Sequence, residues 1–182
     1  IGLVSIMAAN NETGVLQPVS AIGRLVSALA PHAVFHVDAT QVVGKLPVDL
    51  QGEWEDVDAL SFSAHKFHGP KGVGGLYLRP GVELSPLLRG GAQEGGRRAG
   101  TTNTPALAGL AAAAASWEPA TASAVRRLRD QFEVALLERF PDVIIHSVNA
   151  PRLPNTSCFS LPNVVGEELA TKLAAQGLIV GT

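Results

Sequence analysis

The chain has 182 residues, of which 46% are hydrophobic, enough for the buried core of one large domain or one and a half small ones. Its 14 basic and 16 acidic residues leave a formal net charge of -2, and no run of Lys or Arg indicates a nucleic-acid or membrane partner. A single cysteine excludes an internal disulfide framework and a cysteine-built metal site, so the cytoplasm is the expected compartment.

The first part of the chain alternates predicted strands and helices. Short apolar runs predict strands at residues 3–8, 33–37, 58–62 and 75–78. A polar turn, NNETG at 10–14, follows the first run, and apolar residues at helical spacing predict a helix over 18–29. Gly and Pro interrupt any regular element in the loop at 63–74. Buried strands joined by crossover helices favour a doubly wound α/β sheet, in which ligands bind beyond the carboxyl ends of the strands.

The second part begins with a Gly- and Arg-rich connection at residues 89–102, which is either a functional loop or a linker. Ala- and Leu-rich sequence from 104 to about 140 predicts helices that are broken near Pro119. The remaining pattern predicts a strand, a helix and the start of another strand, at 156–161, 166–176 and 178–180. The change of pattern places a domain boundary near residues 104–120.

Asp38 stands at the end of a predicted strand, where an α/β sheet exposes side chains to a ligand, and Lys66 stands in the loop after another predicted strand. The Asp38 carboxylate could pair with a cation such as a pyridinium nitrogen, or it could simply cap a helix. Lys66 stands between a histidine and an aromatic residue, and a lysine that is partly buried near other cations can form an imine with an aldehyde. Ser63 and His65 could hydrogen-bond a phosphate. The alternative is a surface loop with a solvated lysine.

Other chemistries lack their motifs in this sequence. No G-x-x-x-x-G-K-[ST] occurs and no G-x-G-x-x-G stands between a strand and a helix, which argues against nucleotide binding. No G-x-S-x-G supports a serine hydrolase. The five histidines show no H-E-x-x-H or comparable ligand spacing, so no metal site is expected.

Four spaced motifs together resemble the cysteine desulfurases of the class V aminotransferase group. They are NNETG at 10–14, HVDATQ at 36–41, SFSAHK at 61–66 and RAGT at 98–101. The resemblance runs over essentially the whole chain, and the first two motifs are most similar to the housekeeping iron–sulfur-assembly and nitrogen-fixation branch. It implies the fold type I of transferases that depend on pyridoxal 5'-phosphate (PLP). Residues 1–110 would be the C-terminal portion of the large doubly wound cofactor-binding domain, and residues 111–182 an incomplete small α+β C-terminal domain.

Carried over position by position, the resemblance implies a cofactor site. Lys66 would be the catalytic lysine that carries PLP as a Schiff base, and Asp38 would be the partner of the pyridine nitrogen. Gln41 would contact the ring hydroxyl oxygen, and Asn11 would lie near the ring and the substrate carboxylate. The implied phosphate contacts come from Ser63 and His65 and, across a homodimer, from Thr101.

The resemblance also implies what this sequence lacks. The chain is expected to begin in mid-domain, without the amino-terminal part of the family, and to stop just before the loop that holds the persulfide-forming cysteine. The 182 residues alone are therefore expected to be inactive. Cys158, the only cysteine, is expected to pack within a strand rather than to accept sulfur.

The implied activity converts L-cysteine to L-alanine and passes the sulfur to an enzyme persulfide, for iron–sulfur cluster assembly or tRNA thiolation. The implied partners are L-cysteine, a second copy of the chain, and an iron–sulfur scaffold or sulfur-acceptor protein, with no nucleic acid bound directly and no membrane. Two alternatives stay open. One is a selenocysteine lyase of the same fold, which the GGAQE, GTTNTP and RLPNT stretches also resemble. The other is a non-catalytic module for dimerisation or scaffold binding.

Overall fold

A four-stranded mixed sheet forms the centre of the first part of the chain in the computed structural model, which describes residues 1–182. Its strands lie in the order β1 (Leu3–Met7), β2 (Val34–Asp38), β3 (Ala59–Ser63) and β4 (Gly74–Leu78). The first three strands are parallel, and β4 is antiparallel to β3. Each predicted strand is therefore present, with no end displaced by more than one residue.

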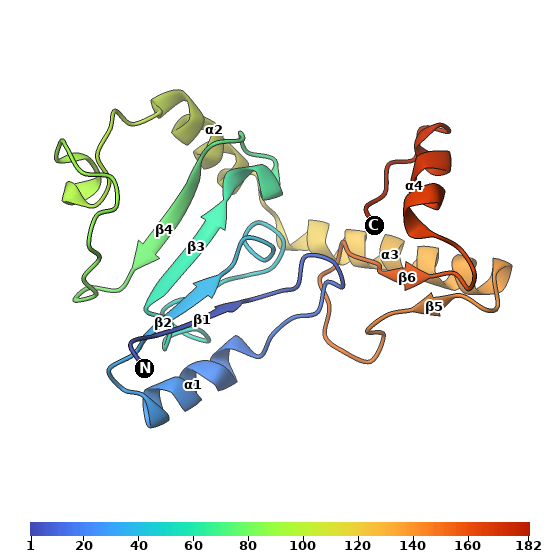
Figure 1. The fold of residues 1–182 in the computed structure, drawn as a ribbon, viewed down its shortest axis with the longest axis horizontal. Helices are drawn as coiled ribbons and strands as arrows, with labels where there is room; N and C mark the ends of the chain where they lie inside the picture. The colour runs from blue at the N-terminus through green and yellow to red at the C-terminus, as the bar shows by residue number, and fades with distance from the viewer.

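The helix α1 (Val19–Leu29) covers one face of this sheet (Figure 1). It approaches closely because Gly23 has no side chain; a Cβ at that position would lie 3.3 Å from the Phe35 ring. Apolar side chains from the sheet, from α1, from the segments that flank the strands and from residue 153 fill the space between them. The fully enclosed set is Ala8, Ala9, Val19, Phe35, Val37, Ala39, Val42, Val57, Leu60 and Leu153.

The opposite face of the sheet carries a polar row. Nδ1 of His36 lies 2.7 Å from Oγ of Ser5, and its Nε2 lies 3.0 Å from Oγ of Ser61, so one imidazole links β1, β2 and β3. Asp38 is two residues further along β2 and therefore faces the same side. The row therefore links the three parallel strands on the face from which this carboxylate projects.

Three elements follow the sheet. The first is a short 3-10 turn, η2 (Gln93–Gly96), and α2 (Thr104–Ala115) comes next. The Asn103 side chain caps α2 by accepting the N–H of Ala106 at 3.2 Å. Gly109 of α2 lies against Pro70, close to the sheet, whereas α3 (Pro119–Arg139) extends away from it (Figure 1). The predicted division between residues 110 and 111 falls inside α2 and stays a prediction.

The last part of the chain lies along α3. β5 (Ile144–Ile145) and β6 (Phe159–Ser160) form a two-stranded antiparallel sheet, and the ring of Phe159 packs 5.9 Å from that of Phe132. α4 (Gly166–Ala174) follows, with its acidic residues in the first turn, where the helix dipole favours them.

The sequence prediction was wrong in detail here. The strand expected at 156–161 shrinks to β6, and β5 was not expected. Residues 178–180 form no strand, because they are exposed and no other strand lies beside them to pair with.

A return segment, residues 151–153, brings the chain back to the first part of the molecule. The N–H of Leu16 donates to the carbonyl of Pro151, and the N–H of Leu153 donates to the carbonyl of Gly14, both at 2.8 Å. Leu153 is fully buried in the core beneath the sheet. Residues far apart in the sequence therefore share one backbone pairing and one core.

A buried ion pair fixes the return segment to α3. Arg152 donates two hydrogen bonds to Glu133, at 2.7 and 2.9 Å, and Arg129 donates to the carbonyl of Leu153 at 2.6 Å. The hydrogen bonds from Arg152 hold the pKa of Glu133 below its ordinary value, and the same contact raises the pKa of Arg152. The charges are therefore mutually satisfied where little water reaches them.

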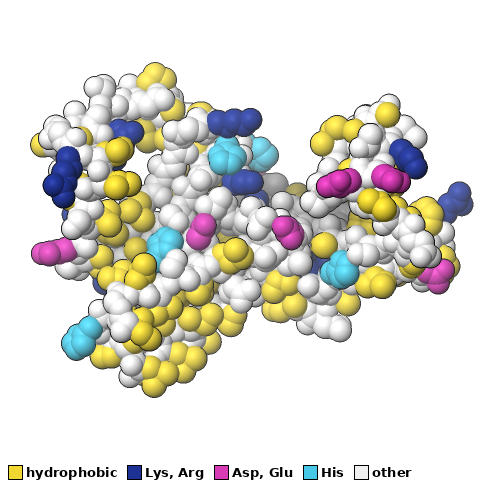
Figure 2. All heavy atoms as spheres, viewed as in Figure 1, with side chains coloured by type: hydrophobic (Ala, Val, Ile, Leu, Met, Phe, Trp, Pro, Cys, Tyr) yellow, Lys and Arg dark blue, Asp and Glu magenta, His cyan; other side chains and the backbone are white.

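The surface view separates two lobes, one around the sheet and one around α3 and α4 (Figure 2). Hydrophobic side chains gather over α1, where Leu25 and Leu29 are exposed. No helix combines the length and the apolar character that crossing a membrane requires.

Candidate functional site

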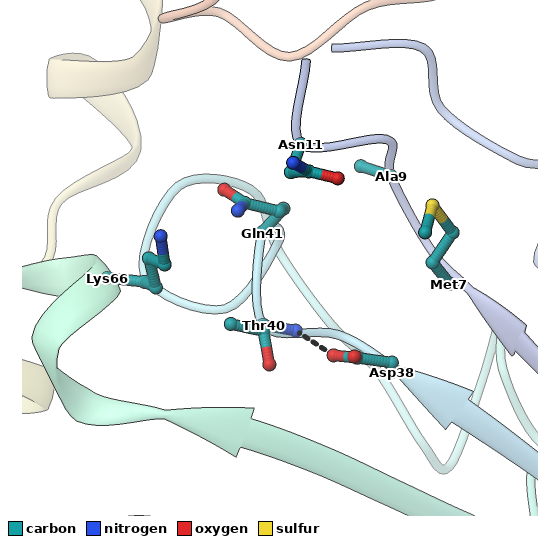
Figure 3. A pocket seen from close by; sticks show the side chains of 7 residues that line it. All are labelled: Met7, Ala9, Asn11, Asp38, Thr40, Gln41 and Lys66. Atoms are coloured by element: carbon teal, nitrogen blue, oxygen red, sulfur yellow. Dashed lines mark hydrogen bonds between the residues drawn. The ribbon is translucent and has the colours of Figure 1, made fainter. Parts of the chain in front are cut away.

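The candidate site begins where β1 and β2 end. Met7, the last residue of β1, lies opposite Asp38, the last residue of β2. Since the carboxyl ends of parallel strands meet at one edge of a sheet, the segments that follow both strands come together there. Oδ1 of Asp38 accepts the N–H of Thr40 at 2.9 Å (Figure 3). Its Oδ2 has no hydrogen bond within the chain and can serve a ligand.

The turn after β1 holds Asn11 at the same edge. Oδ1 of Asn10 accepts the N–H groups of Glu12 and Thr13, at 2.9 and 2.8 Å, and the Thr13 hydroxyl at 3.1 Å. One side chain thus closes the turn. Gly14 completes it with φ of +74°, a left-handed conformation that glycine adopts without strain. A turn fixed in this way places the Asn11 side chain beside the cavity (Figure 3).

Lys66 comes from a single 3-10 turn, η1 (Ala64–Phe67), that directly follows β3. Ala64 and Phe67 are buried and anchor the turn, and the N–H of His68, directly after it, donates to the Ala64 carbonyl. The loop expected at 63–74 therefore contains one short regular turn, of the three to four residues that are usual for a 3-10 helix. Lys66 itself is exposed, so the partial burial expected for it is not found. Its ammonium forms no ion pair with a carboxylate.

A helical turn after Asp38 brings Gln41 and Lys45 together. These residues are four apart and lie on the same side of the turn, and Lys45 Nζ donates to Gln41 Oε1 at 2.8 Å. Lys45 is half-buried. Burial, and then repulsion from the nearby Lys66, lowers the pKa of Lys45 below its ordinary value. The site therefore contains two neighbouring lysines, one of which is engaged by an amide.

These segments surround a cavity of about 270 Å³. Its lining residues are Met7, Ala9, Asn11, Asp38, Thr40, Gln41 and Lys66 (Figure 3). The polar side chains comprise a carboxylate, two amides, a hydroxyl and an amine. This donor set fits PLP, because an amine can bind an aldehyde, a carboxylate can hold a protonated ring nitrogen, and an amide can contact the ring oxygen.

Four of the seven predicted site residues meet at this cavity, namely Asn11, Asp38, Gln41 and Lys66. The other three do not line it. Ser63 is the half-buried last residue of β3, His65 is exposed in η1, and Thr101 is exposed in the connection after η2. Their phosphate contacts stay predictions. No group of three or more His, Cys, Asp and Glu side chains is placed to share a metal ion.

Sequence reasoning missed part of the site, namely Met7, Ala9, Thr40 and Lys45. Met7 lies within the run predicted as a strand at 3–8 and Ala9 lies just beyond it, but both side chains are apolar and carry no chemical signal. Thr40 lies within the HVDATQ motif, so its place there was a usable signal. The spacing of four between Gln41 and Lys45 was a second signal that could have been recognised.

The chain matches the aminotransferase class-V family over residues 1–182. A cysteine desulfurase of Cereibacter sphaeroides is 47% identical over 182 residues, which are 100% of this chain and 46% of that protein. A solved structure described as a NifS-like protein superposes with a TM-score of 0.89 at 41% identity, covering 100% of this chain and 49% of that one. Another, described as SspA in complex with cysteine, has a TM-score of 0.76 at 32% identity and covers 96% and 47%. The chain thus spans about half the length of the proteins that it matches, and the predicted α/β fold is confirmed.

Proposed function

This chain belongs to the class-V aminotransferase family, and we propose that it is part of a PLP-dependent cysteine desulfurase. The observation that carries the proposal is that Lys66, Asp38, Gln41 and Asn11 line one and the same cavity. Two comparisons support it: a relative of 47% identity bears that name, and a similar structure holds cysteine. The proposed reaction converts L-cysteine to L-alanine and transfers the sulfur to an enzyme persulfide.

Each of the four cavity side chains would have its own task. Lys66 would bind the cofactor covalently, since its amine has no carboxylate partner. Asp38, held by the N–H of Thr40, would keep the proton on the pyridine nitrogen. Gln41 would contact the ring oxygen, and Asn11 would lie near the ring and the substrate carboxylate.

The phosphate would be bound outside this cavity. Ser63 and His65 stand at the end of β3 and in η1, next to Lys66 in the chain, so one strand end would hold both ends of the cofactor. Thr101 would reach the phosphate of a second copy in a homodimer. Its exposure in the connection after η2 leaves it accessible for such a contact.

When bound, PLP supplies an electron-withdrawing ring that weakens the bonds at the α-carbon of an amino acid. The overall change balances without an external oxidant. The carbon–sulfur bond of L-cysteine breaks, an enzyme thiol takes the sulfur as a persulfide, and the thiol proton goes to the carbon that becomes the alanine methyl group. That thiol would lie outside residues 1–182. The sulfur would then pass to an iron–sulfur scaffold or sulfur-acceptor protein in the cytoplasm, for cluster assembly or tRNA thiolation, with no nucleic acid bound directly and no membrane.

Borohydride reduction of the full-length holoenzyme, followed by peptide mapping, tests this function. We expect a pyridoxyl label on Lys66 and loss of the label in Lys66→Ala. Lys71→Ala is the matched control, because Lys71 is an exposed lysine in the same loop that does not line the cavity. That variant should keep both the label and the release of alanine from L-cysteine.

Two results would contradict the proposal. A colourless protein that borohydride does not label would favour a non-catalytic module. A labelled protein that releases alanine from L-selenocysteine but not from L-cysteine would be a selenocysteine lyase.

A further inference from the structure

Lys45 is the only side-chain hydrogen-bond partner that the structure gives to the Gln41 amide. Nζ of Lys45 lies 2.8 Å from Oε1 of Gln41, and neither residue has another side-chain hydrogen bond. Lys45 also forms no ion pair, because the ion pairs of the chain join other residues. The ammonium is half-buried, so its one contact with Gln41 has to offset the lost hydration.

The chemistry of this contact fixes which end of the amide faces the cavity. A lysine ammonium can only donate hydrogen bonds, and of the two ends of an amide only the oxygen accepts them. With Oε1 turned to Lys45, the NH2 group of Gln41 is left for the cavity. Figure 3 shows the Gln41 amide extending toward the side on which Lys66 lies. Gln41 can therefore act only as a donor toward a bound group.

We propose that Lys45 is a positioning residue, which locks the Gln41 amide so that it donates its N–H to the ring oxygen of the cofactor. This inference rests on the proposed function. Without Lys45 the amide could flip and present its oxygen, which would repel an oxygen that carries negative charge. The pKa of Lys45 is lowered by its burial and by repulsion from Lys66. This agrees with a half-buried cation whose one hydrogen bond is to Gln41. The charged groups that line the cavity itself are Asp38 and Lys66.

A spectral titration of the full-length holoenzyme tests whether Lys45 fixes the orientation of the Gln41 amide. The pH midpoint of the cofactor absorption band reports how tightly the proton beside the ring oxygen is held. An N–H donated to this oxygen stabilises its negative charge, so loss of the donor moves the midpoint to higher pH. Gln41→Ala should raise it by about half a unit to one unit, as expected for one hydrogen bond. Lys45→Met should raise it similarly, and Lys45→Arg, which keeps a donor, should restore most of the original midpoint.

A double variant separates positioning from direct electrostatics. If Lys45 acts through Gln41, then adding Lys45→Met to Gln41→Ala causes no further shift. If Lys45 acts through its charge on Lys66, the two shifts add, and the inference is overturned. Lys71→Met is the control for removal of an exposed lysine nearby and should leave the midpoint in place.

A second variant protects the test against misfolding. Gln41→Glu keeps a partner for Lys45 but presents no N–H to the cavity, so it should raise the midpoint as Gln41→Ala does. Cofactor content per subunit verifies that each variant is folded. An unchanged midpoint in folded Gln41→Glu or Lys45→Met would overturn the role of Lys45. A wild-type protein without a reducible absorption band would instead refute the proposed function itself.

Discussion

Removing Glu133 should release the return segment from the first part of the molecule. Glu133→Ala leaves the Arg152 guanidinium without its carboxylate in a place where 7% of the Arg152 side chain and 10% of the Glu133 side chain are exposed. Breaking one partner of a buried pair costs about 3–5 kcal/mol, because the remaining charge is uncompensated. Some water does reach this pair and Arg152 could turn toward it, so we take the lower limit, about 3 kcal/mol.

Hydrogen–deuterium exchange of two backbone amides measures this loss directly. The N–H groups of Leu16 and Leu153 close the pairing on either side of Arg152. About 3 kcal/mol corresponds to a rise of about a hundredfold in their exchange rates, if local opening governs exchange. Amides within α1 should exchange as in the unaltered full-length protein. The effect on the return segment would then be local rather than a general loss of stability.

Two control variants define what would refute this reasoning. Asp130→Ala removes a carboxylate that pairs with Arg129 but is 53% exposed, so it should change exchange little. The double replacement of Glu133→Leu with Arg152→Met should restore much of the protection, since it removes both charges. If Glu133→Ala exchanges no faster than Asp130→Ala at Leu16 and Leu153, the ion pair does not hold the segment.

The pH dependence of the same amides gives an independent check. The folded-state pKa of Glu133 is lowered from its usual value of 4.5, mainly by the hydrogen bonds from Arg152. The stability that it contributes is therefore complete above that usual value and is lost as the pH falls through the folded pKa. Protection of Leu153 should decline in this acidic range in the unaltered protein and not in the double variant.

Three further predictions concern the site and its surroundings in the full-length enzyme. Asp38→Asn should keep part of the cofactor content but lower the rate of alanine release by at least about a hundredfold; unchanged turnover would make Asp38 a strand-end cap. Gly44→Ala should destabilise the holoenzyme by about 2–4 kcal/mol in thermal unfolding, because φ at Gly44 is +75° and a Cβ there would collide with Phe67. Gly72 has φ of +81° but no neighbouring atoms, so Gly72→Ala should cost only about 1 kcal/mol. Cys158→Ser should leave persulfide formation nearly intact, and mass spectrometry that finds the persulfide on Cys158 would contradict this.

The strands and α1 could be predicted from the sequence because their signals are local. Buried parallel strands read as short apolar runs, and the face of α1 that packs on the sheet repeats at helical spacing. The ends of these strands then located Asp38 and Lys66, since the edge at which parallel strands end is where ligands bind. Asn11 and Gln41 were located by the family resemblance, and their place at the same cavity agrees with it.

The features that could not be predicted depend on contacts between distant residues. The 3-10 turn of η1 is stabilised by the burial of Phe67, and β5 exists only because β6 lies beside it. Residues 178–180 have the apolar character of a strand but no neighbour to pair with. The return segment has no hydrophobic periodicity that could have predicted it. Its position is set by contacts with Gly14 and Glu133, which lie far away in the sequence.

The pairing of the return segment with Gly14 and Leu16 has a consequence for the order of folding. During synthesis the turn that carries Asn11 leaves the ribosome long before the residues that pair with its far side. Until residues 151–153 appear, the core beneath the sheet lacks Leu153, and the Gly14 carbonyl lacks the N–H that donates to it. Contacts between residues so distant in sequence form late, because a long loop must first be closed. The core beneath the sheet would therefore be complete only after α3 and the return segment have been made, and the proposed cofactor would bind only after the two lobes have docked.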